Sequence, residues 1–350
     1  MGWLASDEPS ATSDTLPTVD GTRATGIALV VVSAIAFGSG GLFAKPVYAT
    51  GVDWLTLMAW RFAIGGGMAW VVLAFRPGSR RALRALPRRT LLGAIGLGVL
   101  YVGNTATYYA GLETMPLGLS ALIVYLYPPI VAVLALRLGL PLQGRRAWSA
   151  LGIAVLGVVL AVGGINPDAT PPLSGILLIL AAPIIYAVWI ILAARLSGER
   201  SDRVGSDADD GANASAIGAV MLTSTAAVYW IVALGIGHPV QPATIPQDAW
   251  PGIIGVAIVA GFIPVQAFYA GAQRIGAAQA SLVSTIEPLW TIVAAGVIYG
   301  ERLEPVQLLG GALILFGVLL SQTGRPRGAE ATRAADEPLL PQPVVRLAED

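Results

Sequence analysis

The feature that most constrains this chain is a series of ten mostly apolar runs, each about as long as a helix that crosses a bilayer. Such a helix needs roughly 20 predominantly apolar residues. The runs span residues 26–46, 54–75, 90–111, 116–136, 147–164, 174–195, 214–236, 250–271, 278–299 and 305–322. In lipid, a segment must satisfy its own backbone hydrogen bonds, so runs of this length predict helices. We therefore expect an all-α membrane protein with ten transmembrane helices.

Composition supports a membrane protein and argues against several other classes. Charged residues make up 12% of the chain, whereas soluble domains carry about 25%. A formal net charge of zero gives no support to a nucleic-acid partner. The chain has no cysteine and a single histidine, His238, and it lacks the motifs of ATPases and hydrolases. We therefore expect no metal, no cofactor and no enzymatic activity, and we interpret His238 as an ordinary surface residue.

The basic residues predict how the chain crosses the membrane. With a cytoplasmic N-terminus, eighteen of the 21 lysines and arginines fall in cytoplasmic segments, two (Lys45 and Arg302) lie outside and Arg61 lies within a span. The positive-inside rule then places both termini in the cytoplasm of a multi-pass protein of the inner or plasma membrane. Residues 1–25 lack the layout of a cleaved signal peptide. These residues, the insert 196–215 and residues 323–350 are polar and are expected to be disordered.

The two halves of the chain repeat one another. Tyr108–Gly111 aligns without gaps with Phe268–Gly271, and at the same offset Pro128 meets Pro288. The predicted repeats are residues 26–164 and 174–322. Each contains five spans, and an odd number forces the two copies into opposite orientations. Inverted repeats around a shared cavity are a transporter architecture.

Two charged residues lie within the apolar runs. Glu287, directly before Pro288, is the only acid deep within a span. An intramembrane carboxylate is costly and therefore a candidate functional group, although it could instead fix the ninth helix against a neighbour. If transport is coupled to protons, Glu287 is the natural carrier. Arg61 could hold a substrate carboxylate or phosphate through paired hydrogen bonds, or it could reach the outer interface or helix-end carbonyls.

Polar and aromatic side chains share faces of several spans and are expected to line a substrate cavity between spans 1, 3, 4, 6, 8 and 9. Asn104 and Gln266 lie near mid-span, where an amide needs a partner; they could instead hold neighbouring helices together. The predicted lining residues are Phe37, Tyr101, Asn104, Tyr108, Tyr125, Tyr186, Trp189, Gln266, Tyr269 and Ser284.

Several stretches resemble a known family. They are Ile286–Leu289, Tyr299–Leu303 and Gly310–Val318, together with Arg61 and Tyr109–Leu112. These resemble an EamA-type transporter of the drug/metabolite transporter superfamily, over about residues 26–322. The first repeat departs from the pattern, because Tyr127 stands where the second has Glu287, and Leu140–Pro141 stand where it has Gly300–Glu301. The first repeat therefore lacks the acids that the second repeat carries at these two places.

The resemblance implies a secondary transporter that works by alternating access, often an exporter of amino acids or other small metabolites. Its partners would be a small-molecule substrate and the lipid bilayer, with proton coupling open and the oligomeric state unassigned. The alternatives are a facilitative or lipid-handling carrier of the same superfamily, a non-transporting membrane scaffold and an integral-membrane enzyme. A scaffold has no need for Asn104, Gln266 and Glu287 at depth, and an enzyme lacks catalytic clusters here.

Overall fold

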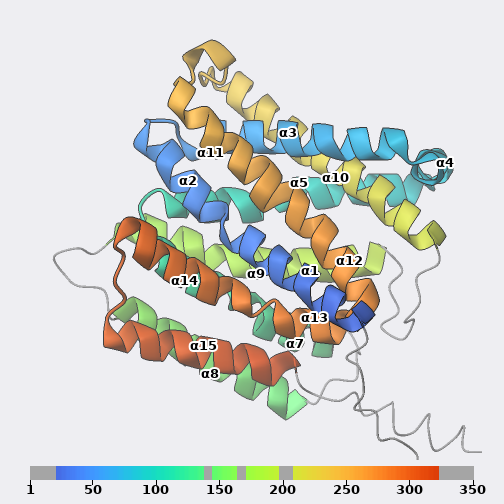
Figure 1. Cartoon of the computed structure of the whole chain (residues 1–350). Coiled ribbons are helices and arrows are strands. Elements are labelled where there is room, and N and C mark those ends of the chain that lie inside the picture. The colour runs from blue at the N-terminus through green and yellow to red at the C-terminus, as the bar shows by residue number, and fades with distance from the viewer. Residues whose placement is uncertain (1–20, 138–143, 164–170, 197–207, 323–350) are drawn as a thin grey trace, which may run out of the picture.

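A computed structural model describes residues 21–137, 144–163, 171–196 and 208–322 (Figure 1). Within these ranges the chain is helical and contains no strand. Ten of the helical segments are long and apolar enough to cross a membrane. The predicted fold class, an all-α membrane protein with ten spans, is confirmed.

The first five spans use eight helices. Spans 1 and 4 each consist of two helices, and a short helix links spans 2 and 3. In chain order the helices are α1 (Gly21–Gly38), α2 (Gly40–Ala49), α3 (Trp54–Phe75), α4 (Pro77–Ala85), α5 (Arg88–Leu112), α6 (Leu117–Val124), α7 (Tyr127–Arg137) and α8 (Gly144–Gly163).

The last five spans repeat this plan only in part, because span 6 is the single helix α9 where span 1 has two helices. Span 8 joins α11 and α12 through a π-helix, and span 9 consists of two helices. The elements are α9 (Leu173–Leu196), α10 (Ala208–Gly235), the 3-10 turns η2 (Pro242–Thr244) and η3 (Gln247–Ala249), α11 (Trp250–Ile254), the π-helix η4 (Gly255–Phe262), α12 (Ile263–Ile275), α13 (Ala277–Val283), α14 (Ile286–Tyr299) and α15 (Pro305–Gln322).

The helix bounds differ little from the predicted spans, but two helices begin earlier. α10 begins at Ala208, so residues 208–215 are helical although disorder was expected there. α1 begins at Gly21, inside the predicted N-terminal tail. In both places the helix extends past the apolar run, because polar residues can continue a helix that the run has nucleated. Residues 1–20, 197–207 and 323–350, where disorder was also predicted, lie outside the described residues.

Spans 1, 4 and 9 are interrupted near their middle, which the sequence analysis did not predict. α6 ends at Val124 and α7 begins at Tyr127. At the repeat offset, α13 ends at Val283 and α14 begins at Ile286. Both breaks precede the prolines that align between the repeats, and proline lacks the backbone donor that would continue the helix. The two breaks therefore occur at nearly equivalent places in the two repeats.

Glycines bring α8 and α15 into close contact, and these helices lie side by side in Figure 1. A Cβ added at Gly310 would lie 2.5 Å from the carbonyl oxygen of Gly157. In lipid the hydrophobic effect does not drive helices together. Small residues favour helix packing instead, because they let the two backbones approach closely. α15 also packs against span 4, because a Cβ added at Gly311 would lie 2.9 Å from the side chain of Leu122.

The two ends of the bundle differ in charge. The turns at one end carry Asp53, Glu113, His238 and Glu301, and we call this the Glu301 end; it is at the left of Figure 1. The opposite end, which we call the Arg76 end, carries α4 at the right of the figure. Most described basic residues lie at the Arg76 end: Arg23, Arg76, Arg80, Arg81, Arg84, Arg88, Arg89, Arg145, Arg146, Arg195 and Arg274.

Candidate functional site

The breaks in spans 4 and 9 are joined by one tyrosine. The Tyr125 hydroxyl lies 2.8 Å from Oε2 of Glu287 and 3.0 Å from the carbonyl oxygen of Ser284. Tyr125 is in the turn between α6 and α7, and Ser284 is in the turn between α13 and α14. Glu287 lies in the first turn of α14, where the helix dipole favours negative charge. A half-helix from each repeat therefore ends at the same polar cluster.

The break in span 1 is bound to the same helix. Nε1 of Trp290 donates to Oγ of Ser39 at 3.0 Å, and Oγ1 of Thr291 donates to the carbonyl oxygen of Gly38 at 2.9 Å. Ser39 separates α1 from α2. Non-helical backbone at membrane depth is tolerated where it is buried in protein or lines a cavity. The three breaks in spans 1, 4 and 9 thus meet at the start of α14.

Aromatic rings form a continuous series from this cluster to Arg61. Neighbouring ring centroids lie 4.8–5.8 Å apart. We call this series the aromatic wall; its members in order of contact are Tyr125, Tyr127, Tyr186, Trp189, Tyr101, Phe62 and Tyr229. The wall includes four of the predicted lining residues, and it presents ring faces that can contact cations as well as apolar groups.

Arg61 is enclosed in the bundle. Its side chain is only 9% exposed, so it does not reach the outer interface. The guanidinium carbon lies 4.8 Å from the centroid of the Tyr109 ring and 5.3 Å from that of Phe62. Among the described residues, no carboxylate lies within 4.0 Å of it. Rings supply part of the compensation that a buried cation needs, but an anionic partner is missing from the described part of the chain.

Asn104 and Trp189 both connect α5 to α9. Nδ2 of Asn104 donates to the carbonyl oxygen of Ala182 at 3.0 Å, and Nε1 of Trp189 donates to that of Leu97 at 3.1 Å. Asn104 therefore makes a contact between helices, which was the alternative to lining the cavity. Trp189 also stacks on Tyr186, so its ring belongs to the aromatic wall.

Three predicted lining residues are exposed. Phe37 is exposed on α1, and Gln266 is exposed on α12 without a hydrogen bond to a described residue. Tyr269 is 55% exposed, yet it lies within electrostatic range of Tyr186. Gln266 is about one turn from Tyr269 and shares its helix face. The structure thus brings Tyr269 near the aromatic wall, whereas no hydrogen bond or ring contact among the described residues connects Phe37 or Gln266 to it.

Glu301 holds the start of α6 at the Glu301 end of the bundle. Its two carboxylate oxygens accept hydrogen bonds from the backbone N–H groups of Leu117 and Gly118, each at 2.9 Å. Nearby, Nζ of Lys45 donates to the carbonyl oxygen of Met115 at 2.7 Å. From the sequence, Glu301 was noted only within the stretches that resemble the family, and it was given no role. Glu301 follows Gly300, whose φ of 67° marks the end of α14. This signal predicts a helix end and gives no role to the next residue.

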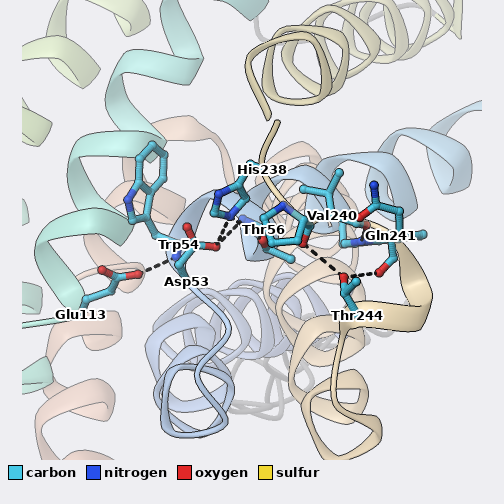
Figure 2. Close-up of polar contacts among 10 residues, drawn as sticks. Asp53, Trp54, Thr56, Glu113, His238, Val240, Gln241 and Thr244 are labelled. Atoms are coloured by element: carbon cyan, nitrogen blue, oxygen red, sulfur yellow. Dashed lines mark hydrogen bonds and ion pairs between the residues drawn. The ribbon is translucent and has the colours of Figure 1, made fainter. Parts of the chain in front are cut away.

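A second polar cluster lies at the same end (Figure 2). Asp53 caps α3 by accepting from the N–H of Thr56 at 3.0 Å. Nε2 of His238 lies 3.0 Å from Oδ1 of Asp53 and 3.1 Å from Oγ1 of Thr56. Glu113 accepts from the N–H of Trp54 at 2.5 Å. Burial raises the pKa of the Glu113 carboxyl above its ordinary value, and this hydrogen bond opposes the rise. His238 is therefore a structural contact between the α10–η2 loop and α3.

The comparisons with known proteins agree with this architecture. The EamA-like transporter family matches residues 24–163 and again residues 173–323, so one family unit corresponds to each half of the chain. An uncharacterized transporter of Archaeoglobus fulgidus is 26% identical, over 85% of this chain and 96% of its own length. The threonine/homoserine exporter RhtA of Escherichia coli is 24% identical, over 82% of this chain and 88% of its own.

A solved structure shares the fold. A protein crystal structure superposes with a TM-score of 0.57 at 18% sequence identity, over 90% of this chain and 99% of that one. This likeness concerns the arrangement of the helices alone.

Proposed function

The chain belongs to the EamA-like transporter family, and on that premise we propose that it is a secondary transporter that exports amino acids or similar small metabolites by alternating access. The observation that carries the proposal is the meeting of three broken spans at Glu287, with Arg61 in the same bundle. Transporters commonly bind substrate at the midplane between repeats, where discontinuous helices end. The similarity to a threonine/homoserine exporter supports amino acids as the substrate class.

The packing of equivalent helices supports alternating access. Every residue from Leu117 to Ile123 in α6, at the Glu301 end, is buried. Among the described side chains of α13, its counterpart at the Arg76 end, only Ala280 is buried. Two inverted copies of one unit thus adopt different packings, as expected if the bundle is closed at the Glu301 end and looser at the Arg76 end.

The arginine distribution supports an orientation of the bundle in the membrane. If the Arg76 end is cytoplasmic, the looser end faces the interior of the cell, with both termini on that side. Substrate would then enter between α13 and its neighbours, reach Glu287 and Arg61, and leave when contacts at the Glu301 end open.

Metabolite profiling tests the function. We compare the culture medium of cells that overproduce the wild-type protein with that of cells that overproduce Arg61→Gln, using Glu304→Gln as the matched control because Glu304 is exposed in a turn. The expected result is an amino acid that accumulates with the wild type and the control but not with Arg61→Gln. Identical profiles for all three proteins and for cells that carry an empty vector, at equal membrane yields, would count against export and favour a scaffold.

A further inference from the structure

We propose that Glu301 is a one-sided latch, which holds the protein closed at the Glu301 end when no substrate is bound and releases before that end opens. The inference rests on the alternating access of the proposed function and names the contact that biases the two states of the bundle. It concerns the resting state of the protein, so it does not depend on which substrate is carried.

The latch joins the two repeats. Glu301 lies in the turn between α14 and α15, in the second repeat. Its carboxylate oxygens accept from the N–H groups of Leu117 and Gly118, at the start of α6 in the first repeat, each at 2.9 Å. The first N–H groups of a helix have no partner within the helix, and the helix dipole favours a negative charge beside them. One carboxylate thus satisfies two backbone donors of the opposite repeat.

The segment that Glu301 binds is also held from another side. Nζ of Lys45, on α2, donates to the carbonyl oxygen of Met115 at 2.7 Å, two residues before Leu117. The side chain of Leu117 is fully buried and leaves no room for a Cβ at Gly41 of α2. Since α2 and α6 belong to the same repeat, a movement of one repeat against the other keeps these contacts and breaks the one to Glu301.

The contact to Glu301 can be broken and remade. Glu301 is only partly buried, and it lies at an end of the bundle. Water can therefore reach the carboxylate and the two N–H groups once they part, which avoids the large cost of leaving buried polar groups without partners. The latch then favours the closed state without locking it, and a substrate that binds the open state better can shift the balance.

The Arg76 end has no equivalent latch among the described residues. α13 is the inverted counterpart of α6, and its first residue, Ala277, aligns with Leu117 at the repeat offset. No side-chain cap is present at the start of α13. Pro141, which lies outside the described residues, aligns with Glu301, and a proline side chain has no acceptor. A latch at one end alone predicts one preferred resting state, closed at the Glu301 end and accessible from the Arg76 end.

Two buried positions report the state of the two ends. Ser120 on α6 and Ala280 on α13 are equivalent at the repeat offset, and both are fully buried. Because the chain has no native cysteine, Ser120→Cys and Ala280→Cys can be made one at a time. The purified protein is placed in lipid nanodiscs without substrate, so that an impermeant maleimide reaches both ends, and the labelling rate of each cysteine is measured.

The latch predicts opposite changes at the two positions. Glu301→Ala should speed the labelling of Ser120→Cys at least about tenfold and should slow that of Ala280→Cys, because the two end states share one population. Glu301→Gln keeps one acceptor oxygen, so it should change both rates in the same directions by a smaller factor. The matched control Glu304→Ala, an exposed acid of the same turn, should leave both rates unchanged.

Two results would overturn the latch. Faster labelling at both positions in Glu301→Ala would mean that Glu301 only stabilises the fold. Rates equal to those of Glu304→Ala would mean that it caps α6 without setting the resting state. If Glu301→Ala yields no folded protein by size-exclusion chromatography, Glu301→Gln decides by the same two criteria. Because no substrate is present, the result stands whether or not counterflow shows amino-acid transport.

Discussion

Tyr125 and Glu287 are joined by a 2.8 Å hydrogen bond that crosses from one inverted repeat to the other. Tyr125 lies at the break of span 4, and Glu287 follows the break of span 9. The contact is asymmetric, because the first repeat carries Tyr127 where the second carries Glu287. The two repeats therefore contribute different chemistry to one site: a phenol from the first and a carboxylate from the second.

Removing the Tyr125 hydroxyl should loosen this contact without removing the ring. Tyr125→Phe keeps the edge contact to Tyr127 and loses the bonds to Glu287 and Ser284. A side-chain hydrogen bond to a charged group contributes about 1.5–3 kcal/mol, so the apparent affinity for an exchanged amino acid should change by about tenfold or more. Counterflow measures this change, and Tyr299→Phe, whose hydroxyl bonds Leu42 far from Glu287, is the matched control. Equal effects of the two changes would argue against a special role for Tyr125.

Glu287 is the group through which protons would be coupled to transport. Glu287→Gln keeps the shape of the side chain and can still accept from Tyr125, but it cannot exchange a proton at working pH. In vesicles with an imposed pH gradient, the variant should lose gradient-driven accumulation of substrate and keep part of its exchange activity. Accumulation by Glu287→Gln driven by a pH difference alone would show that coupling, if present, uses another group.

Glu301 should hold the Glu301 end closed. Glu301→Gln replaces one carboxylate oxygen with an NH2 group that cannot accept, so the bond that this oxygen accepts from Leu117 or Gly118 is lost. The chain has no native cysteine, which permits a single probe at Ser120, a fully buried residue of α6. An impermeant thiol reagent applied from the Glu301 side should label Ser120→Cys several-fold faster when Glu301→Gln is also present. Equal labelling rates with Glu301→Gln and with the control Glu304→Gln would mean that Glu301 caps a helix without closing the bundle.

Glu113 should make the protein less stable as the pH rises. Burial raises the pKa of this carboxyl above its ordinary value of 4.5, so the folded state binds its proton more tightly than the unfolded state does. The stabilising contribution is present below the unfolded pKa and is lost as the pH rises through the folded pKa. Glu113→Gln retains an acceptor for the N–H of Trp54 and removes this dependence. Thermal unfolding should therefore show the variant gaining stability relative to wild type from pH 4 to pH 7; a constant difference would contradict the assignment.

The spans were predictable because the membrane imposes a local requirement on composition. The breaks were harder to place, because a proline restricts the backbone without deciding between a kink and an interruption. Pro128 and Pro288 were aligned correctly between the halves, but the break at Ser39 has no such signal. Asn104 illustrates a different limit: the sequence shows an amide at depth, and only the position of Ala182 shows that it binds a neighbouring helix.

The residues that form the site were only partly predictable, because several of them act through partners that are distant in the sequence. Glu287 and Arg61 were identifiable because charge is rare inside a span. Trp290, Thr291 and Glu301 act through partners more than 180 residues away in the sequence, and nothing in the neighbouring sequence reveals these partners.

Counterflow by the purified protein tests the central claim most directly, namely that amino acids cross the membrane through a site built from Arg61 and Glu287. Liposomes are loaded with an unlabelled amino acid, and uptake of the same labelled amino acid is followed for wild type, Arg61→Gln and Glu304→Gln. The account predicts exchange by wild type and by Glu304→Gln, and a reduction of about tenfold or more in apparent affinity for Arg61→Gln. Exchange by Arg61→Gln with wild-type affinity would contradict it.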